Sequence, residues 1–222
     1  MRVLVVPVKD LARAKSRLAP VLRPPERARL SLVMLEGVLR ACLAQEGWGV
    51  WVISRDAAAL EAAANLGARP VPEHGHRLLS AVRQAESEVT AASREPADPQ
   101  GALAIVLADL PLISAGALAA ALGHGPSAQV VAASAASDGG TNLLLRHPPS
   151  VIPARFGRSS LARHRTEAYR RGVTFREVRI AELGFDLDEP RDIASLLERP
   201  TSNPTRRTCI EMGLPGILRV LA

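Results

Sequence analysis

The sequence holds few of the residue types that mark several large classes of protein. Aromatic residues make up 3% of its 222 residues, so the stacking platforms of single-strand nucleic-acid binders are scarce. Cys42 and Cys209 form no CxxC or metal-ligand spacing, which favours a reducing cytoplasm. No apolar run reaches the length of a transmembrane helix, and Met1–Val8 is typical of a strand rather than a signal peptide. We therefore expect a cytoplasmic globular protein with neither a membrane nor a nucleic acid as partner.

Lysine is also scarce, and its placement is informative. The chain has 28 lysines and arginines and a net charge of +6, yet the only lysines are Lys9 and Lys15. A compact ammonium serves as a point charge for phosphate in a way that the planar guanidinium does not reproduce. The arginines are dispersed, which disfavours a nucleic-acid surface and leaves phosphorylated small molecules as the expected partners. Chance clustering of two rare residues is the alternative.

Familiar catalytic and nucleotide-binding motifs are missing as well. The segment 7–18, PVKDLARAKSRL, lacks the glycines of both GxGxxG and the Walker A loop. It would bind phosphate through cationic side chains and backbone amides. The chain shows no Ser-His-Asp order, no HExxH, and no metal-ligand spacing among its five histidines.

Strand and helix patterns alternate along the chain, which predicts an α/β fold with a mostly parallel sheet covered by helices on both faces. A polar, proline-bearing surface loop is expected at 93–101, and an apolar-ended tail follows Pro200. We therefore divide the chain into a domain at 1–199 and a C-terminal tail at 200–222. Strands are expected at 2–8, 50–53, 69–71, 129–133, 142–145, 174–178 and 185–188, with a buried strand in the run 103–112. Helices are expected from Pro25, after Asp56, at 77–91, after Ser114, from within 156–164 to Arg171, and from Pro190 to Leu197. The helix at 77–91 is expected to bury Leu78, Leu79, Val82, Ala85 and Val89.

The apolar run 103–112, LAIVLADLPL, carries one carboxylate, Asp109, just where its strand pattern gives way to a Leu-Pro turn. In open α/β sheets ligands bind beyond the carboxyl ends of the strands. Asp186 and Asp188 would join Asp109 and the Lys/Arg loop at the same edge. Two carboxylates and a cationic loop suit a Mg²⁺-dependent reaction on a nucleoside triphosphate. A helix cap, a solvated turn or a solvated strand end is the alternative for these carboxylates.

Two glycine segments complete the pattern. The turn 137–141, SDGGT, lets a ligand approach the backbone closely. Gly157 with Ser159 or Ser160 at a helix N-terminus forms an anion nest, although an ordinary serine cap explains the same residues.

Five motifs along the chain point to one family. They are PVKDLARAKSRLAP from Pro7, DLP at 109–111, GGT at 139–141, FGRSSLARH from Phe156 and FDLDEPRDI from Phe185. These motifs resemble those of the 2-phospho-L-lactate/phosphoenolpyruvate guanylyltransferases of deazaflavin coenzyme (coenzyme F-420) biosynthesis, over about residues 1–198. The resemblance implies a nucleotidyltransferase fold of the GT-A-like, Rossmann-like type, with three layers around a mostly parallel mixed sheet. It also implies Mg²⁺, GTP and a phosphorylated three-carbon acid.

The same resemblance implies a role for each matching residue. Asp109 and Asp186 would hold the metal, with Asp188 left open as the second ligand. The acid's carboxylate would lie on backbone amides at Thr141, Gly157 and Ser160. The residues that would face the triphosphate are Lys9, Lys15 and Arg17, and Lys15 and Asp109 would be catalytic.

The sequence departs from the family's pattern at two positions. Family members usually carry Asn at the start of the helix that we place at 77–91, where this chain reads RLLS, and Ala108 stands where Gly is common. Both departures bear on base preference. The alternatives are another nucleotidyltransferase of the same fold, acting on 3-phosphoglycerate, molybdopterin or a sugar phosphate, or a non-catalytic nucleotide-binding module. Oligomeric state is not specified by these patterns, and a homodimer stays open.

Overall fold

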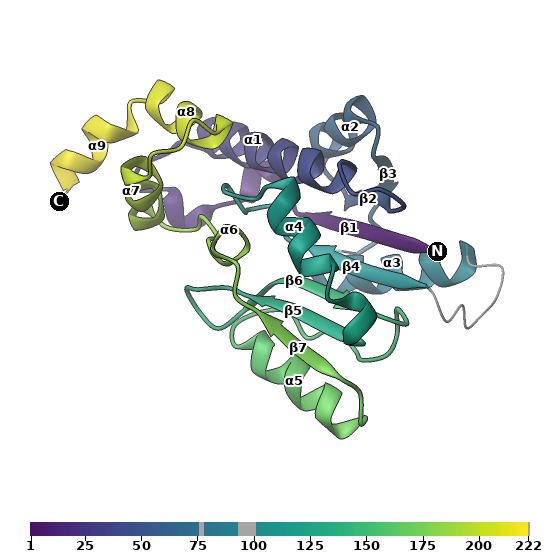
Figure 1. Ribbon diagram of the computed structural model, residues 1–222. Helices are drawn as coiled ribbons and strands as arrows, with labels where there is room; N and C mark the ends of the chain where they lie inside the picture. Colours follow the sequence, from purple (N-terminus) through teal and green to yellow (C-terminus); the bar gives the residue numbers. More distant parts are fainter. Residues whose placement is uncertain (76–77, 93–100, 222) are drawn as a thin grey trace.

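The computed structural model describes residues 1–75, 78–92 and 101–221, and a sheet of seven strands runs through its centre (Figure 1). The strand order is β3-β2-β1-β4-β6-β5-β7, in which β6 runs antiparallel to both of its neighbours and the other pairs are parallel. The predicted mostly parallel mixed sheet is confirmed. The strands are β1 (Arg2–Val8), β2 (Gly49–Ser54), β3 (Arg69–Pro72), β4 (Ala102–Val106), β5 (Val130–Ser134), β6 (Thr141–Arg146) and β7 (Phe175–Val178).

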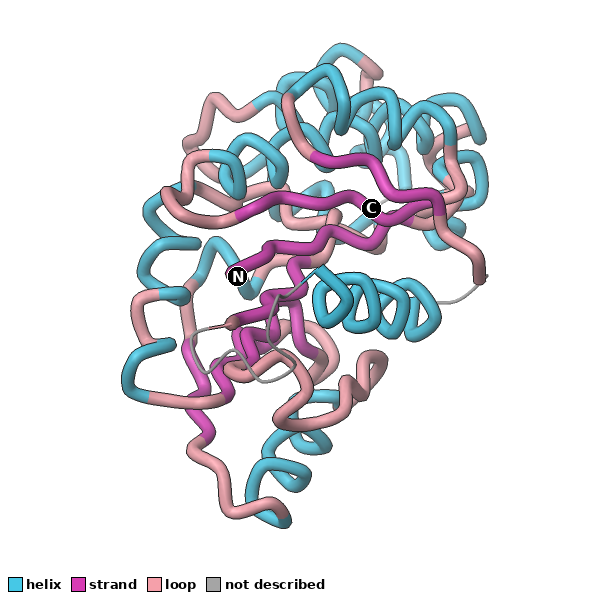
Figure 2. The backbone as a smooth tube through the Cα atoms, turned by 90° about the vertical axis from the view of Figure 1, so that its right-hand side faces the viewer, coloured by secondary structure: helices cyan, strands magenta, loops and turns pink. Residues whose placement is uncertain are grey.

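Helices cover both faces of the sheet, as Figure 2 shows from the side. One buried apolar cluster joins the sheet to α1 (Pro24–Leu43), α2 (Ala57–Leu66), α4 (Ala115–Leu122) and the short α6 (Ala181–Gly184). A second cluster lies on the opposite face under α3 (Leu78–Ala92) and α5 (Ser160–Arg170). The three layers predicted from the alternating pattern are therefore present.

Local signals in the sequence account for several helix ends. The carboxylate of Asp56 accepts the backbone N–H of Ala59 at 3.1 Å, and the Ser114 hydroxyl accepts that of Ala117 at 3.1 Å. Each side chain thus satisfies one of the N–H groups that the first turn of a helix leaves without a partner. Gly67 ends α2 with φ of 91°, a left-handed conformation that glycine adopts without a Cβ penalty.

A third buried cluster holds the C-terminal helices against α1. Its residues come from the first loop, from α1, from Leu187 and α7 (Pro190–Glu198), and from the segment after Pro200, which contributes Cys209 and Leu214. That segment forms α8 (Pro204–Glu211) and α9 (Leu214–Leu221), which lie beside α1 and α7 at one end of the molecule in Figure 1. Short 3₁₀ turns occur at Leu11–Arg13, Ser16–Leu18 and Gly125–Ser127.

Three details of the sequence prediction need correction. Residues 185–188 form no strand, because the backbone N–H of Leu187 donates to the carbonyl of Asp109 (3.2 Å) and that of Asp188 to the carboxylate of Asp192 (2.9 Å). The run from 103 is a strand only as far as Val106. Leu79 is 37% exposed, since it lies about 100° around α3 from the buried face.

Some expectations fall on residues outside the described part of the chain. They are the loop at 93–100 and the first residue of the helix predicted from Arg77. Among the helices of the described ranges, none is both long enough and apolar enough to span a lipid bilayer.

Candidate active site

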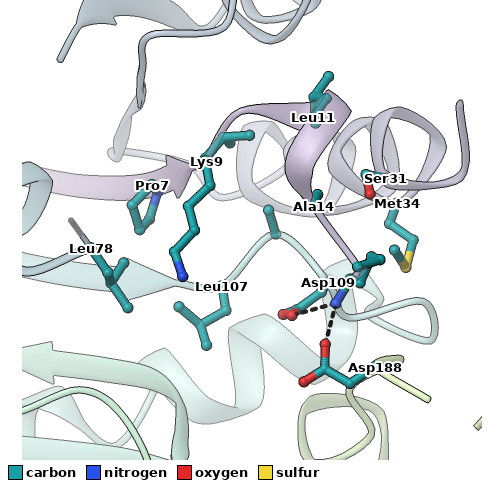
Figure 3. A pocket seen from close by; sticks show the side chains of 13 residues that line it. Pro7, Lys9, Leu11, Ala14, Ser31, Met34, Leu78, Leu107, Asp109 and Asp188 are labelled. Atoms are coloured by element: carbon teal, nitrogen blue, oxygen red, sulfur yellow. Dashed lines mark hydrogen bonds and ion pairs between the residues drawn. The ribbon is translucent and has the colours of Figure 1, made fainter. Parts of the chain in front are cut away.

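Lys15 connects two carboxylates that are far from it in the sequence. Its Nζ lies 2.7 Å from Oδ2 of Asp109 and 2.7 Å from Oδ1 of Asp188, and 7% of its side chain is exposed (Figure 3). Burial alone lowers the pKa of the Lys15 ammonium, but the charges and hydrogen bonds of the two carboxylates together raise it above its ordinary value. The ammonium therefore stays charged between its two partners at neutral pH.

The first loop holds Lys15 in a conformation that its residue type rarely adopts. Lys15 has φ of 54° and precedes the 3₁₀ turn Ser16–Leu18. Leu18, fully buried in the third cluster, donates its N–H to the Lys15 carbonyl at 2.9 Å. A left-handed backbone at a residue with a Cβ costs about 1 kcal/mol or more, and it persists where the surroundings determine it. The buried leucine and the two carboxylates supply those constraints.

A pocket of about 220 Å³ opens beside this ion pair at the carboxyl ends of β1 and β4. Lys9 follows β1, and Figure 3 shows its ammonium extended along the pocket toward Leu107. Pro7, Leu78 and Leu107 give the pocket an apolar wall. An apolar wall beside two lysines suits a nucleoside triphosphate, because the base is apolar on its faces and the phosphates are anionic.

The acidic residues fit a divalent cation. The Oδ1 atom of Asp109 is buried and has no hydrogen-bond partner among the described residues. Burial first, and then the negative charge of Asp109, raise the pKa of Asp186, so these carboxylates crowd one another. Mg²⁺ commonly takes one or two protein carboxylates and fills its shell with water and phosphate oxygens. Within the described ranges, no group of three or more His, Cys, Asp or Glu residues is arranged to hold a metal ion.

The glycine turn 137–141 joins the acidic residues to the N-terminus of α5. The Ser137 hydroxyl lies 3.2 and 3.3 Å from the two carboxylate oxygens of Asp186. The N–H groups of Ser159 and Leu161 donate to the carbonyls of Asp138 (3.3 Å) and Gly139 (3.2 Å). Gly139 has φ of 67°, and Cα of Ser159 lies 3.9 Å from where its Cβ would be. The carboxylates and the N-terminus of α5 are therefore parts of one continuous site.

Thr141, Gly157 and Ser160 lie together at that helix N-terminus. The Ser160 hydroxyl donates to Oγ1 of Thr141 at 3.0 Å, and the Ser160 N–H donates to the Gly157 carbonyl at 3.0 Å. Gly157 has φ of 113°, which a side chain would oppose. The hydroxyls of Thr141 and Ser160 are buried and face each other, and the Ser160 N–H is already bonded to the Gly157 carbonyl. The N–H of Gly157 donates to no other group of the described chain, so it is the amide that this segment can offer to an anion.

The structure thus brings together Lys9, Lys15, Asp109, Asp186 and Asp188, and it joins them to the α5 segment. Arg17 is placed differently: its guanidinium is 3.5 Å from Glu189, and the described pocket beside Lys9 does not include it.

Sequence reasoning missed two contacts of the site. The Ser137–Asp186 contact was missed, although Ser137 belongs to the quoted SDGGT turn. The buried contacts of His164 were missed as well, although His164 ends the quoted FGRSSLARH motif.

Comparison with known proteins identifies relatives that match most of the chain. The family described as "Guanylyl transferase CofC like" matches residues 1–207. A phosphoenolpyruvate guanylyltransferase of Sphaerobacter thermophilus is 40% identical over 87% of this chain and 91% of its own. A 2-phospho-L-lactate guanylyltransferase of Methanothermobacter thermautotrophicus is 33% identical over 87% and 82%. A 3-phospho-D-glycerate guanylyltransferase of Phenylobacterium zucineum is 36% identical over 86% and 88%.

Solved structures agree on the fold. A protein of Desulfovibrio desulfuricans G20, assigned to the nucleotide-diphospho-sugar transferases, superposes with a TM-score of 0.74. The match covers 95% of this chain and 94% of that one, at 16% identity. At that identity the likeness shows a shared nucleotidyltransferase architecture alone.

Proposed function

The chain belongs to the guanylyl transferase CofC-like family, and from this we propose that it transfers GMP from GTP to the phosphate of a phosphorylated three-carbon acid, in deazaflavin coenzyme (coenzyme F-420) biosynthesis. The observation that carries the proposal is the Lys15 ion pair with Asp109 and Asp188, beside a pocket that Lys9 enters. Cations for phosphate and carboxylates for a metal lie at one sheet edge, next to a helix N-terminus.

The reaction needs no general base. The phosphate of the acid is already ionised at neutral pH, so one of its oxygens attacks the α-phosphorus of GTP in line. The bond from the α-phosphorus to the bridging oxygen of the β-phosphate breaks, and pyrophosphate leaves with that electron pair. Catalysis then rests on positioning and on stabilisation of charge. Lys9 and Lys15 are the residues that would face the triphosphate, since both line the pocket.

We assign a Mg²⁺ site to Asp109 and Asp186. The unpartnered Oδ1 of Asp109 and the crowding between the two carboxylates support this assignment. Bound there, the ion would supply Lewis-acid stabilisation of phosphate charge. Asp188 is engaged by Lys15 and would act mainly by holding that ammonium in place.

The acid would bind with its carboxylate on backbone amides near Thr141, Gly157 and Ser160. The relatives' names give three different acids: phosphoenolpyruvate, 2-phospho-L-lactate and 3-phospho-D-glycerate. We favour phosphoenolpyruvate or 2-phospho-L-lactate. Guanine is the base that we expect. The family usually carries Asn at the start of α3, where the described helix of this chain begins with Leu78, so the preference for guanine needs a direct test.

A matrix of substrates tests the proposal. Pyrophosphate release with Mg²⁺ is measured for GTP, ATP, CTP and UTP against each of the three acids. We expect release with GTP and one of the acids. Release with another nucleotide would overturn the base assignment and keep the reaction, whereas no release with any pair would refute the proposed function.

The cellular setting is part of the same proposal. Cys42 and Cys209 are both free thiols in buried positions, which suits a reducing cytoplasm. A homodimer stays a prediction, to be tested by light scattering.

A further inference from the structure

His164 is a buried residue for which the proposed reaction has no role so far. Its side chain is fully buried on α5, among segments that carry the acid-binding residues. Nδ1 lies 3.1 Å from Oγ1 of Thr141, and Nε2 accepts the backbone N–H of Arg155 at 2.8 Å. The ring of Phe156 packs edge-on against the imidazole with centroids 5.5 Å apart.

These contacts fix the protonation state of the ring. A backbone N–H can only donate, so Nε2 must carry a lone pair toward Arg155. Burial first, and then the positive charges of Arg146, Arg163 and Arg155, lower the pKa of His164 to about 3, so the imidazole is neutral at pH 7. Its one hydrogen is then on Nδ1, which donates to Thr141. This is a single tautomer held from both sides.

The two contacts join three segments that are separate in the sequence. Thr141 begins β6 directly after the glycine turn, and Arg155 lies in the loop two residues before Gly157. His164 itself stands one helical turn after Ser160, whose hydroxyl also bonds to Thr141. The guanidinium of Arg163 closes the same loop by donating to the carbonyls of Arg155 (3.0 Å) and Phe156 (3.4 Å).

We propose that His164 is a positioning residue for the acceptor acid, joining the start of β6, the 155–157 loop and the first turn of α5 into one fixed arrangement. The inference rests on the proposed function, because it assumes that the acid lies on the amides of these segments. His164 does not touch the acid. It sets the spacing of the amides that do, and it has no contact with the pocket of Lys9 and Lys15.

Variants at position 164 separate this role from general stability. His164→Phe fills the volume of the imidazole but makes neither of its two hydrogen bonds. His164→Asn can restore the donor to Thr141, and His164→Gln can restore the acceptor for the Arg155 N–H. For His164→Phe we expect KM for the acid to rise about tenfold or more, with KM for GTP within about twofold, because buried hydrogen bonds are each worth up to about a tenfold change. His164→Asn and His164→Gln should each show a smaller rise.

Ala168→Gly is the matched control. Ala168 is buried on the same helix, and glycine weakens the helix without touching the His164 contacts. We expect it to lower the melting temperature and to leave both KM values within about twofold. Equal rises in both KM values for His164→Phe, or the same acid-specific rise in Ala168→Gly, would overturn the positioning role. If His164→Phe does not fold, the Asn and Gln variants decide the question by the same KM comparison.

A spectroscopic measurement tests the tautomer independently of turnover. Nitrogen chemical shifts of His164 in the whole protein should show a protonated Nδ1 and an unprotonated Nε2, unchanged down to about pH 5. A titration near the ordinary histidine pKa, or a proton on Nε2, would overturn the inference. Absence of turnover by the unaltered protein with every acid would instead refute the proposed function, so the two failures are distinguishable.

Discussion

The two carboxylate oxygens of Asp109 have different surroundings. Oδ2 holds Lys15 at 2.7 Å, and Oδ1 is buried without a partner in the described chain. Asp109→Asn keeps the shape and removes the charge, so we expect turnover to fall by about 10³-fold or more, as several kcal/mol of charge stabilisation would be lost. Circular dichroism should be unchanged. Near-normal turnover in this variant would show that the metal assignment is wrong.

Lys15 offers a second test at the residue scale. Lys15→Ala removes the one ammonium that both carboxylates contact, and we expect kcat/KM to fall about 100-fold or more. Arg176→Ala is a matched loss of one positive charge at an exposed position on β7, and we expect a change within about twofold there. Equal small losses would mean that the pairing of the two lysines in the first loop is accidental.

The neutral His164 predicts how stability depends on pH. Its pKa is about 3 in the folded state and about 6.5 when unfolded, so between these values the unfolded chain binds the additional proton. The contribution to the free energy of unfolding is therefore fully present above the unfolded pKa and falls by up to about 1.4 kcal/mol per pH unit as the pH drops below it. The free energy of unfolding, measured by urea denaturation at several pH values, should depend less steeply on pH for His164→Gln than for the unaltered protein. The raised pKa of Asp186 acts with the opposite sign, but it is common to both proteins and cancels in the difference. An identical dependence of the unfolding free energy on pH in the two proteins would contradict the assignment of a buried neutral imidazole.

At the scale of the element, the segment after Pro200 is held by a few buried side chains. Leu214 is fully buried in the cluster with Leu30 and Met34, whereas Val220, on the same helix, is 86% exposed. Leu214→Ala should cost about 2–5 kcal/mol of unfolding free energy, and Val220→Ala within about 0.5 kcal/mol. Chemical denaturation of the two variants measures the difference. A cost of only about 0.5 kcal/mol for Leu214→Ala, the range of exposed substitutions, would contradict the burial of Leu214 and the anchoring of α9 by it.

Elements whose signals are local could be predicted from the sequence. The helices after Asp56 and after Ser114 and the apolar strands were predicted because each rests on a few adjacent residues. The segment 185–188 alternates like a strand, but its N–H groups bond to the Asp109 carbonyl and to the Asp192 carboxylate. Those partners are tertiary, so the pattern alone could not reveal them.

The same limit applies to the candidate site. The rule for carboxyl ends of strands correctly predicted that Lys15 and Asp109 would meet, because it depends on topology alone. The choice between Asp186 and Asp188 depends on how an irregular segment turns: Asp188 contacts Lys15 and Asp186 contacts Ser137. The role of His164 likewise depends on a loop that brings the backbone N–H of Arg155 to the imidazole Nε2, a tertiary contact that no sequence spacing encodes.

At the scale of the whole molecule, the net charge of +6 meets substrates that are all anions. Two effects could follow: a field of the entire surface that attracts anions, or attraction by the few cations near the pocket. The Debye length is about 10 Å at 0.1 M salt, so cations on distant elements are largely screened under working conditions. The cations near the pocket are those of the first loop, Lys9, Lys15 and Arg17. They would account for most of the electrostatic attraction of the substrates at working salt concentrations.

Salt dependence distinguishes the two effects. We expect KM for GTP to rise roughly three- to tenfold between about 0.05 and 0.5 M salt, with kcat within about twofold, because screening weakens binding more than chemistry. Arg17→Ala and Arg176→Ala lower the net charge equally, but Arg17 adjoins Lys15 and Arg176 lies on β7. Arg17→Ala should flatten the dependence of KM on salt, and Arg176→Ala should leave it unchanged. If the two variants flatten it equally, the field of the whole surface attracts the substrates, and the dispersed arginines act in binding despite their distance from the pocket.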